Sequence, residues 1–182
     1  MRHASKTLLW GPFSRLGLGI AAATFVFDQV HKWWMLLRVG MHEGDRIPVT
    51  PFFDWYFVLN KGVSYSFLTG SDGRWQLALA AFALIASLLL AGWLARGVDN
   101  RLAAASVGLI IGGALGNGLD RLTLGGVADF ISLHAFGFYW YVFNIADVAI
   151  VAGVVGLLYE SVYPASHPNA RSAATKPTQS DH

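Results

Sequence analysis

The chain has 182 residues, of which 54% are hydrophobic and 13% are charged; a soluble domain of this length carries about twice that charged fraction. The composition therefore predicts one domain that is embedded in a membrane. The net charge of +2 is small and scattered, so it does not indicate nucleic-acid binding. The absence of cysteine excludes disulfides, thiol nucleophiles and cysteine-ligated zinc.

Four apolar segments each approach the roughly 20 residues that a helix needs to cross a bilayer. They are residues 16–37, 75–95, 102–119 and 138–159. The second and third contain no charged residue, and the fourth is interrupted only by Asn144 and Asp147. The sequence therefore predicts a mostly helical membrane protein with four transmembrane helices.

The first segment has a second interpretation, because basic residues precede a 12-residue apolar run as in a signal peptide. The apolar character resumes at Trp33 and Trp34, however, after Asp28, Gln29, His31 and Lys32. A signal peptide has a shorter apolar region than this, so we expect the first helix to be retained.

Basic residues suggest an orientation. The side that holds both termini and the loop 96–101 contains more Lys and Arg than the other, which favours cytoplasmic termini. Residues 38–74 then form the main periplasmic segment, and "RIPVTPFFDWYFVLN" (46–60) predicts short strands at the membrane surface. We expect a single domain over residues 1–163 and a disordered cytoplasmic tail over 164–182.

Alternation of four spans brings the costly polar residues to one membrane face. Asp28 and Lys32 lie in the second half of a helix that runs outward, and Asn117 and Asp120 end the third helix on that same side. Asn144 and Asp147 begin the fourth helix there, and the loop 121–141, which carries Asp129, joins the third and fourth on this face. Ionisable residues inside membranes are rare and usually functional, so this convergence predicts a site.

Some of these residues have structural interpretations. Asp28 and Lys32 share a helical face with His31, so they either form a self-neutralising pair, with Lys32 reaching toward the interface, or line the site. Asp120 next to Arg121 predicts a structural ion pair. The four-residue spacing of Gly108, Gly112 and Gly116 predicts close packing against another helix.

Asp129 and Asp147 have no nearby basic residue in the sequence. Either could simply be solvated on its own. If they are close together in a low dielectric, however, they cannot both ionise and will share a proton. One can then activate water as a base while the other protonates the carbonyl oxygen or the leaving amine. This is the chemistry of an aspartic protease.

Other catalytic schemes have weaker support. The sequence contains no HExxH motif, so no metal site is predicted, and it contains no GxSxG motif. A serine–lysine dyad that uses Lys61 with Ser64 or Ser66 has no specific signature. His134 is interpreted as a polar loop residue.

Five motifs in order resemble the bacterial lipoprotein signal peptidase (signal peptidase II) family of intramembrane aspartic proteases. They are "DQVHK" (28–32), "NKGVSYSF" (60–67), "GNGLDR" (116–121), "GGVADFI" (125–131) and "FNIADVAI" (143–150). The resemblance implies four transmembrane helices with a small extramembrane β-cradle and a short periplasmic helix. It implies that Asp129 and Asp147 are catalytic. Residues that hold the site together or meet substrate would be Asp28, Lys32, Asn60, Gly62, Asn117, Asp120, Arg121, Asn144 and Ala146.

The resemblance also implies a substrate and a location. The substrate would be a prolipoprotein whose cysteine carries diacylglycerol, cut just before that cysteine. The missing cysteine and the missing HExxH motif separately predict hydrolysis without a metal or other cofactor. The enzyme would be a monomer among the phospholipids of the inner membrane, with its site near the periplasmic face. His31, "VSYS" and Ala128 depart from the usual family residues at the periphery of the site. The alternative function is a small proton-coupled transporter or channel, with Asp28, Asp129 and Asp147 as the relay.

Overall fold

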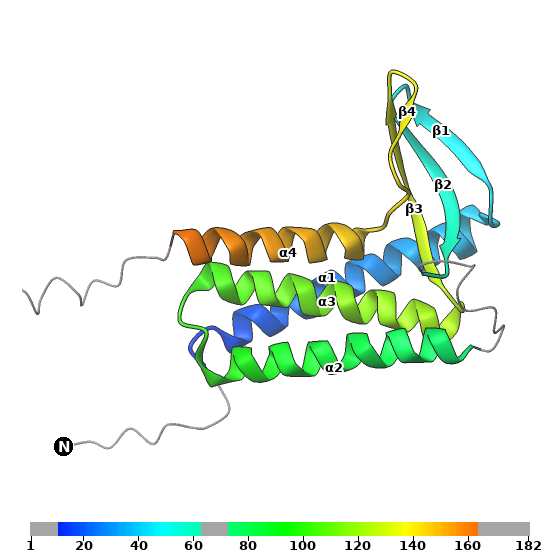
Figure 1. Cartoon of the computed structure of the whole chain (residues 1–182). Helices are drawn as coiled ribbons and strands as arrows, with labels where there is room; N and C mark the ends of the chain where they lie inside the picture. The colour runs from blue at the N-terminus through cyan, green and yellow to red at the C-terminus, as the bar shows by residue number, and fades with distance from the viewer. Residues whose placement is uncertain (1–10, 63–72, 164–182) are drawn as a thin grey trace, which may run out of the picture.

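The computed structural model describes residues 11–62 and 73–163 (Figure 1). It contains four long helices: α1 (Ser14–Trp34), α2 (Arg74–Gly97), α3 (Arg101–Thr123) and α4 (Ile145–Val162). α1 continues into one π-helical turn, η1 (Met35–Val39). The first three predicted spans are confirmed as helices to within a few residues. The fourth helix begins at Ile145 rather than at residue 138, because residues 138–139 form a strand.

Among the described helices, α2, α3 and α4 are long and apolar enough to cross a membrane by length and composition. α1 is comparable in length but less apolar, because Asp28, Gln29, His31 and Lys32 occupy its last turns. Most of the outward-facing surface of α2 and α4 consists of large exposed apolar side chains such as Leu88 and Val151. Such a surface is stable in lipid rather than in water.

Helix α3 is the centre of the bundle and packs against α1, α2 and α4. Its glycines allow this, as the four-residue spacing predicts. A Cβ added at Gly112 would come within 2.5 Å of the Ala21 carbonyl oxygen on α1, and one at Gly113 within 2.5 Å of the Ala146 carbonyl oxygen on α4. Small residues at these positions therefore bring both neighbouring backbones against α3.

Four antiparallel strands form one sheet in the order β1 (Arg46–Thr50), β2 (Phe53–Asn60), β3 (Val127–Ala135) and β4 (Phe138–Tyr139). The strands predicted within residues 46–60 are confirmed. The expectation that residues 121–141 form a loop is wrong, because β3 runs through the middle of this segment. β3 lacks the alternating pattern of a half-exposed strand, since Val127 to Phe130 are all buried between α3, β2 and α1.

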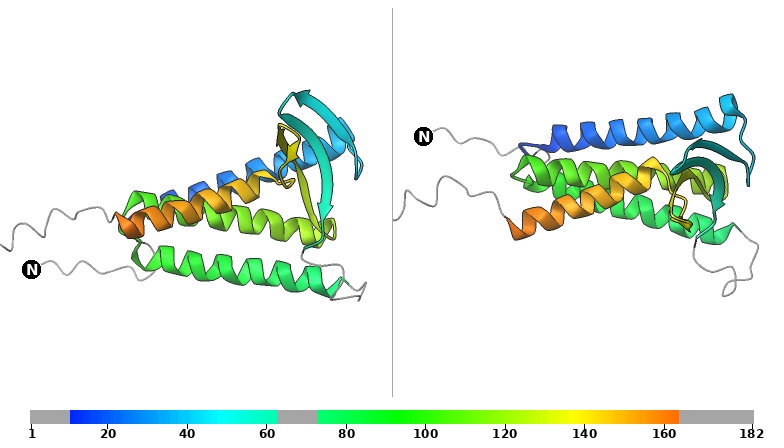
Figure 2. Two further views of the ribbon diagram at one scale, coloured as in Figure 1. Left: turned by 45° about the horizontal axis from the view of Figure 1, so that its top comes forward. Right: turned by 90° about the horizontal axis from the view of Figure 1, so that it is seen from above.

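The sheet lies at the end of the bundle where α3 ends and α4 begins, and its strands run across the helix axes rather than along them (Figures 1 and 2). An apolar cluster that includes Met35, Phe57 and Phe130 joins the sheet to the end of α1. Residues 40–62, which follow η1, contain no helix. Residues 63–72 and the predicted tail 164–182 lie outside the described residues.

Candidate active site

Lys32 lies at the centre of a buried ionic cluster between α1 and α3. Its Nζ lies 2.8 Å from Asp28 Oδ2 and 2.7 Å from Asp120 Oδ2, and it donates a hydrogen bond of 3.1 Å to Asn117 Oδ1. The predicted Asp28–Lys32 pair is therefore confirmed. The idea that Lys32 reaches toward the interface is wrong, because Lys32 is fully buried and is satisfied within the bundle.

Arg121 does not pair with Asp120, contrary to the sequence-based expectation. Asp120 accepts instead from Lys32, from Gln29 Nε2 at 2.9 Å and from the Ala128 N–H at 3.1 Å. Adjacent residues on a helix point in different directions, so Arg121 leaves this cluster and its Nη1 donates to the Asn117 carbonyl at 2.9 Å. Asp120 thereby ties α3 to both α1 and the start of β3.

Asp28 connects α1 to the start of α4. Its Oδ1 accepts from the Ala146 N–H at 2.9 Å, one of the amides at the helix N-terminus that has no partner within the helix. Gly116 permits this approach, since a Cβ there would lie 2.7 Å from Asp28 Oδ2. Gln29, which sequence reasoning did not select, also donates to Asp28 and Asp120; its only signal was its place in the "DQVHK" motif.

Asp147 sits in the first turn of α4 in a capping box with Asn144. The Asp147 N–H donates to Asn144 Oδ1 at 2.9 Å, and the Asn144 N–H donates to Asp147 Oδ2 at 3.2 Å. Asn117 Nδ2 donates to Asp147 Oδ1 at 2.8 Å from α3. These three hydrogen bonds fix the orientation of the Asp147 carboxyl group relative to α3 and the start of α4.

Asp129 approaches the same point from β3. Its Oδ1 accepts from Asn144 Nδ2 at 2.6 Å, and its Oδ2 accepts from Asn60 Nδ2 at 3.1 Å. Asn60 is itself oriented by the Gly62 N–H, which donates to Asn60 Oδ1 at 3.0 Å. Gly62 adopts φ +90°, a conformation that glycine adopts readily.

Asn144 therefore hydrogen-bonds to both aspartates, as well as to Asn117 Oδ1 through its side chain at 3.1 Å. Burial, with the charge of Asp147 as the second cause, raises the pKa of Asp129 to about 7. A carboxyl group in this state holds a proton near neutral pH that it can give up during a reaction. The structure thus brings together the two aspartates that the sequence singled out.

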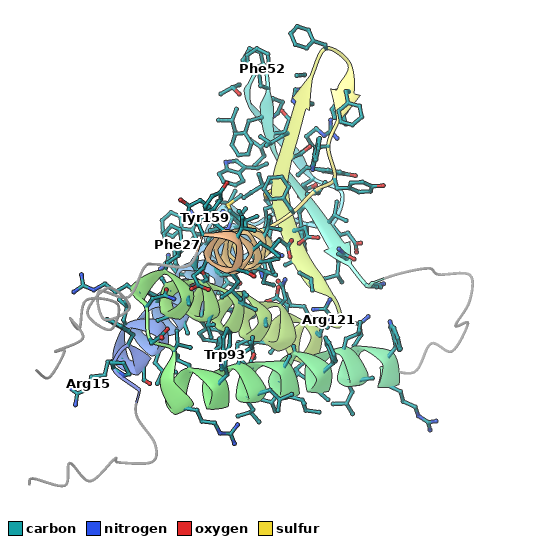
Figure 3. All side chains as sticks on the ribbon, turned by 60° about the vertical axis from the view of Figure 1, so that its left-hand side comes forward. Arg15, Phe27, Phe52, Trp93, Arg121 and Tyr159 are labelled. Atoms are coloured by element: carbon teal, nitrogen blue, oxygen red, sulfur yellow. The ribbon has the colours of Figure 1, made fainter. Side chains whose placement is uncertain are left out.

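Arg121 lies where α3 meets the sheet, within electrostatic range of Asp147, Asp120 and Asp129 (Figure 3). Its Nε is buried and has no hydrogen-bond partner. The guanidinium is thus a positive charge close to the two aspartates, in addition to that of Lys32, although neither aspartate has a basic neighbour in the sequence. Its Nε–H is therefore an unsatisfied hydrogen-bond donor close to the pair.

Two histidines lie nearby but outside this cluster. His134 is on β3 rather than in a loop, and its Nε2 lies 3.2 Å from Asp54 Oδ2. His31 packs against the rings of Trp55 and Phe130. In the described part of the chain no three His, Asp or Glu side chains are placed to hold a metal ion. Ser64 and Ser66, the candidate serines of the serine–lysine dyad with Lys61, lie outside the described residues.

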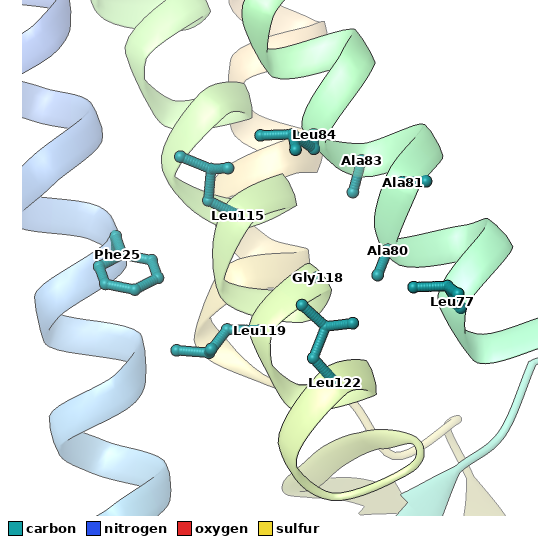
Figure 4. Close-up of a pocket in the computed structure, with 10 residues that line it drawn as sticks. All are labelled: Phe25, Leu77, Ala80, Ala81, Ala83, Leu84, Leu115, Gly118, Leu119 and Leu122. Carbon is teal, nitrogen blue, oxygen red and sulfur yellow. The ribbon is translucent and has the colours of Figure 1, made fainter. Parts of the chain in front are cut away.

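An apolar groove of about 440 Å³ lies on the opposite face of α3 (Figure 4). It is bounded by α2 and α3 with Phe25 of α1 at one side, and its ten lining residues are all apolar. α4 passes behind α3 in this view, so the groove and the aspartate pair use different faces of the same helix. The groove carries no group that could take part in hydrolysis.

Fold and site together define a class: a helical membrane protein with a pair of buried aspartates where its bundle meets a small sheet. Residues 20–163 match the family described as "Signal peptidase (SPase) II". The chain belongs to the signal peptidase II family, and the enzyme is an aspartic peptidase.

Relatives and solved structures agree with this assignment. The chain is 44% identical to the lipoprotein signal peptidase of Methylocella silvestris, with 88% of this chain and 90% of that protein covered. It is 45% identical to that of Methylobacterium sp. (strain 4-46), covering 85% and 93%. A bacterial membrane enzyme structure determined by the in meso method at 1.9 Å resolution matches with a TM-score of 0.70 and 26% identity, covering 87% and 99%.

Proposed function

We propose that this protein hydrolyses the peptide bond that joins a signal peptide to a prolipoprotein, with Asp129 and Asp147 as the catalytic pair. The observation that carries the proposal is Asn144, which holds both carboxylates in one hydrogen-bonded cluster at the end of the bundle. Relatives at about 45% identity over most of the chain are named lipoprotein signal peptidases. We further propose that the substrate cysteine carries diacylglycerol and that cleavage occurs just before it.

In the proposed reaction Asp147 accepts a proton from water while the water oxygen attacks the carbonyl carbon of the scissile bond. Asp129 gives its proton to the carbonyl oxygen, so a neutral tetrahedral diol forms. The carbon–nitrogen bond then breaks, and the proton held by Asp147 passes to the leaving amine. As the carbonyl re-forms, its proton returns to Asp129, and the pair regains its starting state.

The other candidate residues support this pair. Asn60, Asn117 and Asn144 fix the orientation of the carboxylates, and Gly62 orients Asn60. The buried cluster of Asp28, Lys32 and Asp120 holds α1, α3 and the start of β3 together, and Ala146 contributes its backbone N–H to this cluster. We propose that the free Nε of Arg121 binds a carbonyl of the substrate backbone.

The structure gives less support to a proton-coupled transporter. In the described residues, the buried aspartates and the buried lysine lie on the sheet or at the sheet end of the helices. The buried polar side chains toward the other end are serines such as Ser14 and Ser106, which do not titrate near neutral pH. A transmembrane proton path needs exchangeable groups along its whole length.

Replacement of each aspartate by asparagine tests the assignment. Asp129→Asn and Asp147→Asn should each lower kcat for a diacylglyceryl-modified substrate by at least about 10²–10⁴-fold, since general acid–base catalysis is lost. The double variant should be little slower than either single one, because the two residues act as one unit. Asp45→Asn, which removes an exposed carboxyl of the same extramembrane region, is the matched control and should keep full activity.

A folded single variant with near-normal turnover would contradict the assignment, as would a double variant that loses the full product of the two single effects. Substrate without the diacylglyceryl group tests the finer claim. It should be cut much more slowly by the wild-type enzyme, and equal rates on both substrates would reject lipid recognition.

A further inference from the structure

Exposed aromatic side chains line the end of the sheet farthest from the bundle and the segment that returns from it to α4. We call this set the aromatic edge, and it comprises Phe52, Phe136, Phe138, Trp140 and Tyr141. Phe136, in the turn between β3 and β4, is fully exposed, and Tyr141 is 88% exposed. Figure 3 shows Phe52 at the far end of the sheet, away from the helices. In water, so many exposed rings would favour aggregation.

The aromatic edge lies at a particular depth along the bundle. In Figures 1 and 2, α1 and α2 extend past the level at which the sheet projects sideways. The sheet therefore projects beside the last turns of α1 and the first turns of α2, and not beyond the ends of these helices. If the apolar helices cross a membrane, this level corresponds to the boundary between headgroups and acyl chains on the side of the active site.

The scarcity of charged side chains near the aromatic edge also suits the boundary between headgroups and acyl chains. Residues 135–146, which include most of the aromatic edge, contain no charged side chain. Asp54, a buried carboxylate of the sheet, lies 3.5 Å from Arg46 Nη1 and 3.2 Å from His134 Nε2. Pairing with Arg46 lowers the cost of placing this carboxylate beside lipid.

We propose that the aromatic edge inserts into the headgroup–acyl boundary of the leaflet that faces the active site, with glycerophospholipid as the occupant. Tyr and Trp are amphipathic and favour this zone of a bilayer. The edge leads through Tyr141 to α4, where the apolar side chains of Val148 and Val151 are also exposed. Insertion would hold the sheet along the membrane surface, and with it β3, which carries Asp129.

The natural absence of cysteine permits a direct test by site-specific fluorescence. Single-cysteine variants F136C and F52C would each carry an environment-sensitive dye in phosphatidylcholine–phosphatidylglycerol nanodiscs. Matched controls are L88C, on the exposed face of α2, and E43C, in the exposed loop before β1. Quenching would be measured with aqueous iodide, with a lipid spin-labelled near the headgroup and with a lipid spin-labelled near the chain end.

Insertion predicts that the dyes at positions 136 and 52 lose most fluorescence to the shallow lipid quencher and little to iodide. The dye at position 88 should respond to the deep quencher and the dye at position 43 to iodide. Strong iodide quenching at position 136, equal to that at position 43, would overturn the proposal. Protection from all three quenchers would also overturn it, because the edge would then contact protein, such as a second copy of the chain.

Discussion

Asn144 shows how a single side chain can define a site. It caps α4, bonds to Asp129 on β3 and reaches Asn117 on α3, so three separate elements meet at one amide. Burial of Asp129, with the nearby charge of Asp147 as the second cause, raises its pKa to about 7, although the hydrogen bonds from Asn60 and Asn144 act in the opposite direction. The charge state of Asp129 therefore changes within the physiological pH range, and both stability and activity should depend on pH.

The raised pKa predicts the sign of this dependence. A carboxyl group whose pKa is higher in the folded state than in the unfolded state stabilises the fold fully below its ordinary pKa of 3.8, and this contribution is lost as the pH rises through about 7. The thermal unfolding midpoint in detergent should therefore decrease as the pH is raised from 3.8 to about 7. Asp129→Asn should reduce this dependence of the midpoint on pH. Asp45→Asn should leave the pH dependence of the midpoint unchanged; an unaltered pH dependence in Asp129→Asn would contradict the assignment.

The value of kcat/KM should also decline above about pH 7, because Asp129 loses the proton that it donates.

Gly62 offers a second prediction at the scale of one residue. Gly62→Ala places a side chain at φ +90°, where it also meets Leu79 Cδ1 at 3.3 Å. The backbone should shift, Asn60 should lose its orienting bond, and kcat should fall at least several-fold because Asp129 is less well positioned. Gly44→Ala imposes a similar strain at φ +95° in open space away from the site.

Turnover and unfolding temperature of both glycine variants would separate strain from catalysis. Both should lose some stability, roughly 1–2 kcal/mol for a strained αL residue. Only Gly62→Ala should lose kcat. Equal losses of turnover in the two variants would show that the effect comes from general destabilisation.

At the scale of elements, the position of α3 against α1 and α4 decides where every site residue lies. Gly112→Ala would drive a Cβ to within 2.5 Å of the Ala21 carbonyl oxygen and 2.7 Å of Thr24 Cβ, so α1 and α3 must separate. That separation should loosen the Lys32 cluster that joins the two helices. We expect a loss of stability of about 1–3 kcal/mol, typical of overpacking, together with lower activity.

Gly92→Ala on α2 is the matched control, since a Cβ there meets nothing within 4 Å. In a helix this change should be neutral or slightly stabilising. Thermal unfolding in the same detergent would compare the two variants. A Gly112→Ala variant as stable as Gly92→Ala would mean that the close approach of α1 and α3 is unimportant.

At the scale of the whole molecule, the start of α1 and the end of α4 lie at the end of the bundle opposite the sheet (Figure 1). We propose that this end is cytoplasmic and that the site faces the periplasm, in agreement with the excess of Lys and Arg near the termini. A single cysteine at Glu43 should then react with a membrane-impermeant maleimide in intact cells, whereas one at Arg96 should react only after lysis. The reverse pattern would overturn the orientation.

The sequence by itself determined the membrane class, the helical spans and the two aspartates. These follow from local properties: an apolar run predicts a helix in lipid wherever it packs, and a carboxylate in such a run is costly enough to stand out. The glycine spacing likewise predicted close helix contact. The strands around residues 46–60 were also recognisable, because they lie partly exposed between prolines.

Only the tertiary structure decided which partners these residues take. Periodicity could not identify β3, because the first half of the strand, Val127 to Phe130, is buried on both faces. Asp120 pairs with Lys32, 88 positions away, rather than with the adjacent Arg121. Side-chain direction on a helix and contacts between distant segments set such pairings, and neither is encoded in local spacing. The elevated pKa of Asp129 has the same origin, since burial and the approach of Asp147 exist only once β3 and α4 have come together.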